Sequence, residues 1–219
     1  MIKIEEVKNN SDLKKFVKFP FKLYKDSKYW VPPIISEEIN IFNSDINPAL
    51  KNANVSLYIA IIDNEIVGRI AAIINSIEVN EQKTKKIRFG WFDVIDDLNV
   101  TKKLIDKVIE IGKANNLEYM EGPMGFSNLD KVGVLTYGFD KIGTMVTWYN
   151  HPYYSSHFKK LNFTVEKKYS EKTFSFQNID IDYYFRMSKI IQRRYDFKAV
   201  NFNKTEDVLN NVNEMFDLF

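Results

Sequence analysis

The sequence contains no cysteine and only two histidines among 219 residues. The absence of cysteine excludes disulfide scaffolds, thiolate metal sites, iron–sulfur clusters and cysteine nucleophiles. Two histidines are too few for a multi-histidine metal centre, so we expect no metal site. Any chemistry must therefore come from carboxylates, hydroxyls, amides, single imidazoles or the backbone.

An excess of charge of one sign is also absent. The sequence has 31 Lys and Arg residues and 29 Asp and Glu residues, which gives a formal net charge of +2. This balance gives no basic field, so we expect no nucleic-acid partner. No apolar run approaches the ~18 residues that cross a bilayer, and residues 1–13 lack the apolar stretch of a signal peptide. We therefore expect a cytoplasmic protein without a membrane partner.

The residues that are present predict a folded α/β protein. The composition is 45% hydrophobic and 27% charged, which is typical of a globular chain. Two β-rich runs joined across Asp63-Asn64-Glu65 predict a hairpin. The order of strands and helices predicts an α/β (α+β) architecture built on a mixed sheet. Further strands are expected at 2–7, 86–95, 117–120 and 163–176, and helices at 11–24, 99–111 and 153–161.

Three local expectations can be checked directly. Pro20 should kink or break the first helix, because proline removes a backbone donor and clashes with the preceding turn. Asn99 is the expected cap of the central helix. Five of the eight glycines fall between Gly122 and Gly143, which marks a long loop that more often carries a site than a defect.

The end of the chain repeats its beginning. Residues 197–219 align without gaps to residues 2–24, with identities at Lys198, Asp207, Val212, Phe216 and Leu218. We interpret the match as a tandem duplication. The predicted organisation is one domain over 1–178, a linking helix over 179–195, and the first strand and helix of a second, truncated repeat over 196–219. A helix is expected to begin at Asp180 and to end near Arg193-Arg194.

The element order, the hairpin carrying residues 65–69 and the helix followed by residues 160–163 resemble the GNAT superfamily of acyl-CoA N-acyltransferases. Four segments more narrowly resemble the N-terminal half of a bacterial group of tandem GNAT-like proteins: FVKFPFKLYKDSKYWVPPI (16–34), GRIAAIIN (68–75), GFD (138–140) and YNHPYY (149–154). The resemblance covers residues 1–178. It implies a mixed, mainly antiparallel central sheet with helices on both faces, in which two central strands splay apart to receive acetyl-CoA or another acyl-CoA.

The resemblance also implies roles for individual residues. The fourth strand, where Gly90 permits a bulge, would hold the cofactor through its backbone, and the loop after the first helix would shape the pocket of a small-molecule amine or acyl acceptor. Glu121 and His151 are candidate bases, and Tyr154 is the candidate acid that protonates the leaving thiolate. The candidate cofactor-binding residues are Phe89, Gly90, Trp91, Phe92, Asp93 and Asn150, and the candidate acceptor-binding residues are Tyr29, Trp30, Tyr149 and Tyr153.

Two positions depart from the family pattern. The loop that should receive the pyrophosphate has no glycine or basic residue and instead contains Asp96 and Asp97, which would repel phosphate. The position of the family's acid tyrosine holds Phe158. We therefore expect acyl-CoA binding to be weak or absent in this half, with catalysis depending on a C-terminal half of the same chain.

Three hypotheses for function follow. The first is the N-terminal half of a tandem GNAT-like N-acyltransferase. The second is a non-catalytic module that binds a small molecule or a peptide on a GNAT scaffold. The third is a structural module that forms a homodimer.

Overall fold

The computed structural model describes residues 1–127, 130–144 and 147–218. The chain forms two compact units, Met1–Tyr169 and Ser170–Phe219. The first unit contains a five-stranded sheet with helices, and the second unit is helical. No helix among the described residues is long and apolar enough to cross a membrane.

The sheet has the strand order β1-β2-β3-β4-β5. The first four strands pair antiparallel with their neighbours, and β5 pairs parallel with β4. The predicted hairpin is β2–β3, and Asp63 and Asn64 at its turn have φ of 47° and 66°, as a tight turn between twisted strands requires. The strands are β1 (Lys3–Glu6), β2 (Ala53–Ile62), β3 (Glu65–Asn75), β4 (Lys86–Val94) and β5 (Tyr119–Glu121).

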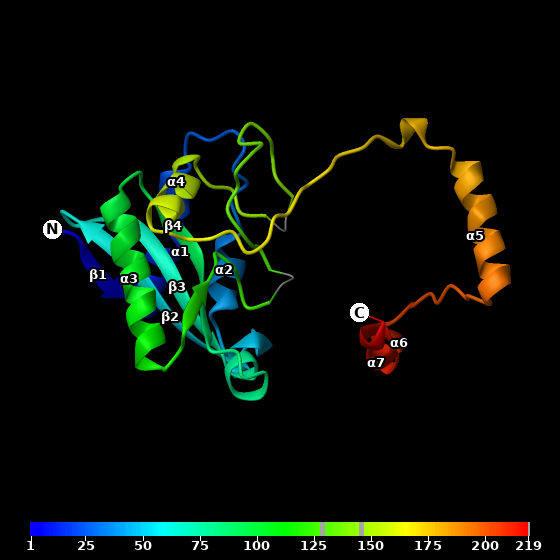
Figure 1. The fold of residues 1–219 in the computed structure, drawn as a ribbon, viewed down its shortest axis with the longest axis horizontal. Coiled ribbons are helices and arrows are strands. Elements are labelled where there is room, and N and C mark those ends of the chain that lie inside the picture. The colour runs from blue at the N-terminus through cyan, green and yellow to red at the C-terminus, as the bar shows by residue number, and fades with distance from the viewer. Residues whose placement is uncertain (128–129, 145–146, 219) are drawn as a thin grey trace. The chain divides into compact units, whose positions relative to one another are not determined.

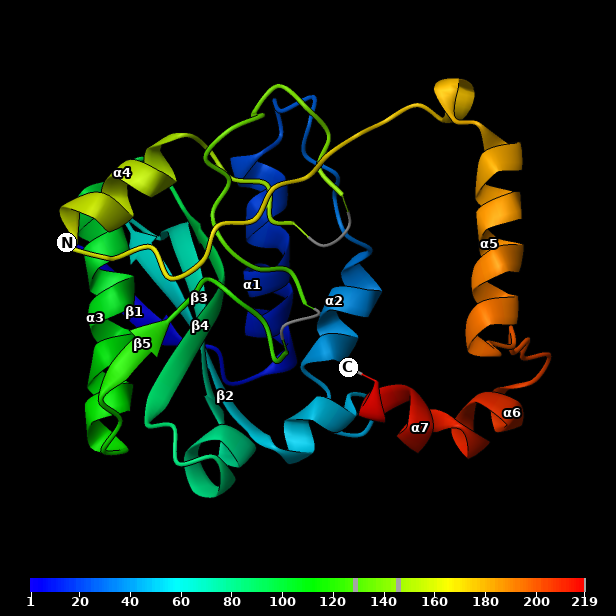
Figure 2. The same ribbon diagram turned by 45° about the vertical axis from the view of Figure 1, so that its right-hand side comes forward.

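Helices cover both faces of the sheet (Figures 1 and 2). On one face, α1 (Asn10–Leu23) and α2 (Ile35–Ile41) pack on a core that includes Phe16, Ile73 and Trp91. On the other face, α3 (Leu98–Ala114) and α4 (Tyr153–Lys160) enclose a core that includes Phe89 and Leu104. The predicted fold class, a mixed and mainly antiparallel sheet between helices, is confirmed. Shorter helical turns are η1 (Pro48–Lys51), η2 (Ile77–Glu81) and η3 (Phe176–Asn178).

Two expectations for residues 1–176 are not met as stated. Pro20, which was expected to kink or break the first helix, does not break α1, which continues to Leu23. Residues 163–176 alternate in polarity but form no strand; the short turn η3 begins at their last residue. Alternation marks residues that suit a strand, but a strand is stable only beside a partner that satisfies its backbone groups.

The second unit contains α5 (Ile181–Tyr195), α6 (Thr205–Asn210) and α7 (Val212–Asp217). The predicted start of α5 is confirmed, because Asp180 accepts a hydrogen bond from the backbone N–H of Tyr183 at 2.9 Å. The strand predicted after it is not formed: residues 197–204 have no strand pairing. Among the described residues of this unit there is no other strand to pair with. The division of the chain into one domain and a partial repeat stays a prediction.

Candidate functional site

A bulge interrupts the pairing of β3 with β4. Arg69 lies opposite Asp93 and Ala71 opposite Gly90, so Trp91 and Phe92 together face one residue of β3. The left-handed residue is Trp91, with φ of 44°, which is a strained conformation for a bulky side chain. The bulge directs Trp91 to the α1–α2 face and Phe92 to the α3–α4 face.

Gly90 is needed for a different reason from the one predicted. A Cβ at this position would lie 2.2 Å from the carbonyl oxygen of Met124. The glycine therefore lets the chain after β5 approach β4 closely, while Trp91 supplies the left-handed backbone of the bulge. The bulge itself, expected at Gly90, is confirmed one residue later.

Beyond the bulge, no strand among the described residues pairs with β4 on the side of β5. The parallel pairing ends at Arg88 and Glu121. The backbone N–H of Ile95 donates to the carbonyl oxygen of Val67 in β3 at 3.0 Å. The backbone groups of successive residues in a strand point to opposite sides. Those of Val94 therefore point away from β3, toward the side of β5. This is the edge at which the family resemblance locates an acyl-CoA.

Two hydroxyl groups of α4 occupy this edge. The backbone N–H of Val94 donates to the hydroxyl oxygen of Tyr154 at 2.9 Å. The hydroxyl of Tyr153 donates to the carbonyl oxygen of Val94 at 2.6 Å. Both polar groups of this residue are therefore satisfied from within the chain.

The Tyr154 hydroxyl belongs to a buried chain of hydrogen bonds. Tyr24 donates to Asp93 Oδ1 at 2.7 Å, and the oxygens of Tyr24 and Tyr154 are 2.9 Å apart. Because the single Tyr24 proton goes to Asp93, Tyr154 donates to Tyr24. Arg69 Nε donates to the other carboxylate oxygen of Asp93 at 2.7 Å. The chain thus runs from Val94 N–H through two phenols to an ion pair, and every side chain in it is buried.

Pro20 explains how α1 joins this network. Proline has no N–H, so in an α-helix the carbonyl four residues earlier loses its partner. That carbonyl belongs to Phe16, and it accepts a hydrogen bond from Arg69 Nη1 at 3.0 Å. The guanidinium therefore satisfies both the helix carbonyl and the Asp93 carboxylate, so α1 tolerates the proline without breaking.

Burial raises the pKa of Tyr24 and of Tyr154 well above the usual value for a phenol. The negative charge of Asp93 raises both further. Burial, followed by the charges of Asp96 and Asp93, also raises the pKa of Tyr153. All three hydroxyls are therefore protonated at neutral pH, and the role of Tyr154 as a proton donor to a thiolate stays a prediction.

Four predicted site residues gather around Tyr24. The ring of Trp30 lies 5.4 Å from the ring of Tyr24, that of Tyr149 at 5.5 Å and that of His151 at 5.0 Å. Tyr153 stacks on His151 at 5.4 Å. The structure thus brings both predicted sets, the acceptor residues and His151, to the Val94 end of β4. The side chain of Tyr29 has no ring contact within this group; its backbone N–H donates to the hydroxyl of Ser27 at 3.3 Å.

Glu121 lies elsewhere. It accepts a hydrogen bond from Lys86 Nζ at 2.7 Å and pairs with Arg88 in the register of the two strands. Lys86 and Arg88 also bind the buried carboxylate of Glu78. Arg88 and Val94 are six residues apart on β4, about 20 Å at ~3.3 Å per residue, so Glu121 and His151 cannot serve one reacting atom.

Asn150 is engaged with the loop rather than with the strand edge. Its amide oxygen accepts from the N–H of Leu135 at 2.7 Å, and its amide nitrogen donates to the carbonyl oxygens of Leu135 and His151. The side chain is 3% exposed. It therefore pins the glycine-rich segment beside the aromatic group, and its cofactor-binding role stays a prediction.

The first turn of α3 is closed by carboxylates. Asp97, not Asn99, caps the helix and accepts from the N–H of Asn99 at 2.8 Å. Asp96 Oδ1 lies 3.1 Å from Nε2 of the buried His157, whose Nδ1 is 2.8 Å from the hydroxyl of Thr101. An anion that approached this helix end would meet two carboxylates.

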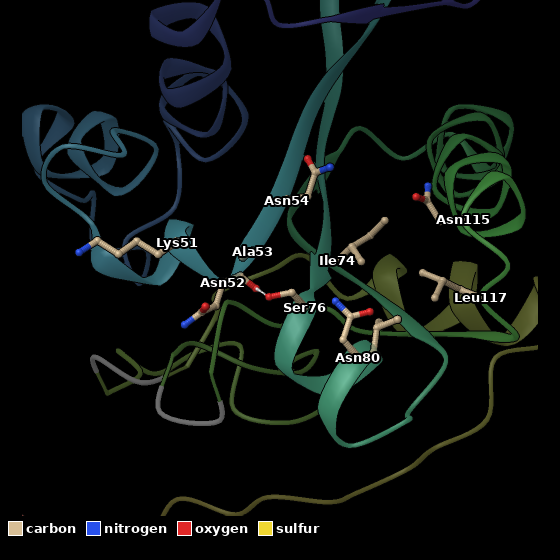
Figure 3. A pocket seen from close by; sticks show the side chains of 10 residues that line it. Lys51, Asn52, Ala53, Asn54, Ile74, Ser76, Asn80, Asn115 and Leu117 are labelled. Atoms are coloured by element: carbon tan, nitrogen blue, oxygen red, sulfur yellow. Dashed lines mark hydrogen bonds between the residues drawn. The ribbon is translucent and has the colours of Figure 1, made fainter.

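A hollow of about 450 Å³ opens at the opposite end of the strands (Figure 3). Its rim carries the side-chain amides of Asn52, Asn54, Asn80 and Asn115 beside the apolar Ile74 and Leu117. None of the predicted site residues lines it. Among the described residues, no three or more His, Asp or Glu side chains are arranged to hold a metal ion.

Sequence reasoning did not single out Tyr24, Arg69 or His157 as functional residues. Arg69 could have been identified from the sequence, because it is the single charged residue in an apolar strand and a buried charge needs a partner. Asp93 is a charged residue in the next apolar strand and could have been identified as that partner. Tyr24 and His157 had none, because their partners come from segments more than 50 residues away.

No family model matches the chain. It is 25% identical over 212 residues to Protein YghO of Escherichia coli (strain K12), covering 95% of this chain and 54% of that protein. It is 30% identical over 137 residues to a bacterial ceramide synthase of Caulobacter vibrioides, covering 61% of this chain and 35% of that protein. The chain therefore spans about half or less of the curated relatives that it matches.

Similar solved structures include a predicted acetyltransferase with acetyl-CoA from Clostridium acetobutylicum, with 14% identity, a TM-score of 0.49, and coverage of 79% of this chain and 96% of that one. An aminoglycoside acetyltransferase in complex with sisomicin, from an uncultured soil sample, has 15% identity, a TM-score of 0.46 and coverages of 80% and 97%. A tandem GNAT protein from the clavulanic acid pathway has 9% identity, a TM-score of 0.42 and coverages of 53% and 34%. The GNAT-like fold is seen in this chain's own strand order, its parallel β4–β5 pair and its bulge in β4.

Proposed function

We propose that this chain is the N-terminal part of a longer tandem GNAT-like N-acyltransferase, and that its first unit does not bind acyl-CoA in the usual manner. In this proposal the unit contributes the acceptor side of the reaction or the interface to the second half. One observation carries it: Tyr154 and Tyr153 occupy both backbone groups of Val94.

The hydroxyls of Tyr153 and Tyr154 would have to leave the edge of β4 before a cofactor could bind there. A pantetheine arm pairs with free backbone groups of the fourth strand in the family that this chain resembles. Here a pantetheine would have to displace two phenols, and displacing Tyr154 would leave the Tyr24–Asp93 network one partner short. An unsatisfied buried polar group costs about 1–3 kcal/mol. That cost weighs against binding at this edge.

The entrance to α3 supports the same proposal. A helix N-terminus attracts phosphate because its first N–H groups lack partners. In this chain the Asp97 carboxylate accepts a hydrogen bond from one of those N–H groups, that of Asn99, and Asp96 adds a second negative charge. The pyrophosphate of a coenzyme would therefore meet repulsion where the family provides attraction.

The name of one relative supports an acyl transfer to nitrogen. That relative is named as a ceramide synthase, and ceramide is an amide of a long-chain amino alcohol. In such a reaction the amine attacks a thioester carbonyl, the coenzyme thiol leaves, and a base takes the amine proton. His151, stacked on Tyr153 in the aromatic group, is our candidate for that base, with the acyl donor held by the remainder of the protein.

Calorimetric titration of acetyl-CoA into the 219-residue chain tests the binding claim. We expect no saturable heat in the wild type. Micromolar affinity that is lost in Asn150→Ala would contradict the proposal, because it would show a working cofactor site in this unit.

Acyl transfer by the longer protein tests the enzyme claim. Thiol release from an acyl-CoA, measured with long-chain amines as acceptors, should fall about 10²–10⁴-fold in His151→Ala, the usual contribution of a general base. Lys141→Ala, on an exposed loop of the same unit, is the control. An unchanged rate in His151→Ala would remove the base assignment, and a coding sequence that stopped after Phe219 would remove the tandem assignment.

The aromatic group around Tyr24 supports a second candidate, a non-catalytic module for a small molecule or a peptide. A thermal-shift screen distinguishes the two. Stabilisation by a ligand class other than amines and acyl-CoAs, without turnover in the longer protein, would favour the binding module.

A further inference from the structure

The hollow at the end of the strands away from Val94 has an apolar centre and a polar rim (Figure 3). Its volume of about 450 Å³ lies within the ~300–1,000 Å³ that is usual for small-molecule sites. The side chains of Ile74 and Leu117 point toward each other across it, and both residues are half-buried. The side-chain amides of Asn54, Asn80 and Asn115 lie around this centre. An apolar centre with a few polar groups around it is the usual composition of a ligand site.

These three amides come from three different elements. Asn54 lies at the start of β2, Asn80 lies in η2, and Asn115 directly follows the last residue of α3. The side chains of Asn54 and Asn80 form no hydrogen bond with another described residue. Asn115 Nδ2 donates to the carbonyl oxygen of Ile111 at 2.9 Å, which leaves the amide oxygen of Asn115 without a donor from the described residues. All three side chains can therefore exchange water for a ligand.

The wall that carries Asn80 is of a rare type and is anchored to the sheet. η2 is a π-helical turn, and such turns are uncommon and occur frequently at functional sites. The side-chain oxygen of Asn75 accepts a hydrogen bond from the first backbone N–H of the turn at 2.9 Å. The buried carboxylate of Glu78, within the turn, binds Arg88 Nε at 3.0 Å and Lys86 Nζ at 2.9 Å, both from β4. The position of Asn80 is therefore set by buried charges rather than by a free loop.

The lining of the hollow does not suit an ion or an aromatic ligand. Its single charged residue is Lys51, whose side chain points away from Ile74 and Leu117 in Figure 3. An anionic group is bound by charge-assisted hydrogen bonds from basic side chains, and a cation by carboxylates or by aromatic rings. Among the described residues, neither a carboxylate nor an aromatic ring lines this hollow. A nucleobase would also lack the aromatic side chain on which such bases stack.

We propose that this hollow binds a small uncharged ligand with several hydroxyl groups, of the class of a monosaccharide or disaccharide. A side-chain amide offers two donors and an accepting oxygen, and a hydroxyl both donates and accepts, so the two groups pair in either direction. Ile74, Val79 and Leu117 provide apolar contacts for the C–H surface of a sugar ring. The proposal does not depend on the proposed function, because the hollow contains no residue of the Val94 edge or of the aromatic group around Tyr24.

NMR titration of the isotope-labelled 219-residue chain with glucose and with maltose tests the proposal. We expect saturable shifts of the side-chain amide signals of Asn54, Asn80 and Asn115. Parallel titrations with choline, inorganic phosphate and adenosine should give no saturable shift of these signals. Asn54→Ala/Asn80→Ala should weaken sugar binding by about tenfold, because each hydrogen bond lost lowers the affinity severalfold.

Asn40→Ala/Asn99→Ala is the matched control. It removes two exposed amides from α2 and α3 of the same unit that do not line the hollow, and it should leave the sugar affinity unchanged. Because all four substituted positions are exposed, both variants should melt at the temperature of the wild type.

Two results would overturn the proposal. The first is the absence of saturable shifts with both sugars, or sugar binding that Asn54→Ala/Asn80→Ala does not weaken. The second is tighter binding of choline, phosphate or adenosine than of either sugar at these amides, because the ligand of the hollow would then be charged or aromatic.

Discussion

Replacing Arg69 by methionine tests whether the ion pair under α1 organises the end of β4. The side chains of Arg69 and Asp93 are 4% and 8% exposed. Removing one partner of a buried ion pair leaves a charge without compensation and costs about 3–5 kcal/mol. Arg69→Met also removes the donor to the Phe16 carbonyl that Pro20 leaves unsatisfied, so we expect the upper part of this range.

The assays are urea unfolding and thermal melting, both followed by tryptophan fluorescence, since all three tryptophans lie in the first unit. For a chain of this size about 3 °C of melting temperature corresponds to 1 kcal/mol, so the upper part of the range lowers the melting temperature by about 12–15 °C. Lys102→Met is the control. It breaks an exposed pair with Asp106, at 58% and 44% exposure, and should cost at most about 0.5 kcal/mol.

A double variant distinguishes the cost of an uncompensated Asp93 charge from the cost of the lost Arg69 packing. In Arg69→Met/Asp93→Asn the uncompensated carboxylate is gone, so this protein should be more stable than Arg69→Met alone. The reasoning is refuted if Arg69→Met costs no more than the exposed control, or if the double variant is the less stable of the two.

Three further predictions follow from the same core. Gly90→Ala should destabilise the first unit by about 1–3 kcal/mol, measured by urea unfolding, because a backbone carbonyl lies 2.2 Å from the new Cβ. Burial alone would raise the pKa of Glu78, but the hydrogen-bonded Arg88 and Lys86 outweigh burial and lower this pKa below its ordinary value of 4.5. The stabilisation from the Glu78 carboxylate is therefore complete above pH 4.5 and is lost as the pH falls through the lowered pKa. The loss of stability in Glu78→Gln, measured by thermal melting, should become smaller in acid. The pKa values of Tyr24 and Tyr154 are raised, so the stability that their protonated hydroxyls contribute is complete below the ordinary pKa of 10.0 and is lost as the pH rises through the raised values. Ultraviolet titration should show these two phenols ionising only when the protein unfolds.

The sequence predicted those features that depend on local pattern. The β2–β3 hairpin follows from two apolar β-branched runs around Asp63 and Asn64, and the start of α5 follows from a carboxylate at Asp180. Pro20 does not break α1, and the sequence could not show this because the deciding group, the Arg69 guanidinium, comes from a strand about 50 residues later. Similarly, Asp97 rather than Asn99 caps α3, and choosing between two capping residues only two positions apart requires the geometry of the turn.

Composition excluded thiol chemistry, and the order of strands and helices predicted a mixed sheet. The family resemblance implied helices on both faces and a phosphate loop, at whose place the sequence has Asp96 and Asp97. Which residues meet depended on the tertiary structure. It joined Arg69, Asp93, Tyr24 and Tyr154 into one hydrogen-bonded chain, separated Glu121 from His151, and satisfied the open edge of β4 with the hydroxyls of α4. The physical reason is that hydrogen bonds and charges are satisfied by neighbours in space. Local pattern reports which groups need a partner but not which segment provides it.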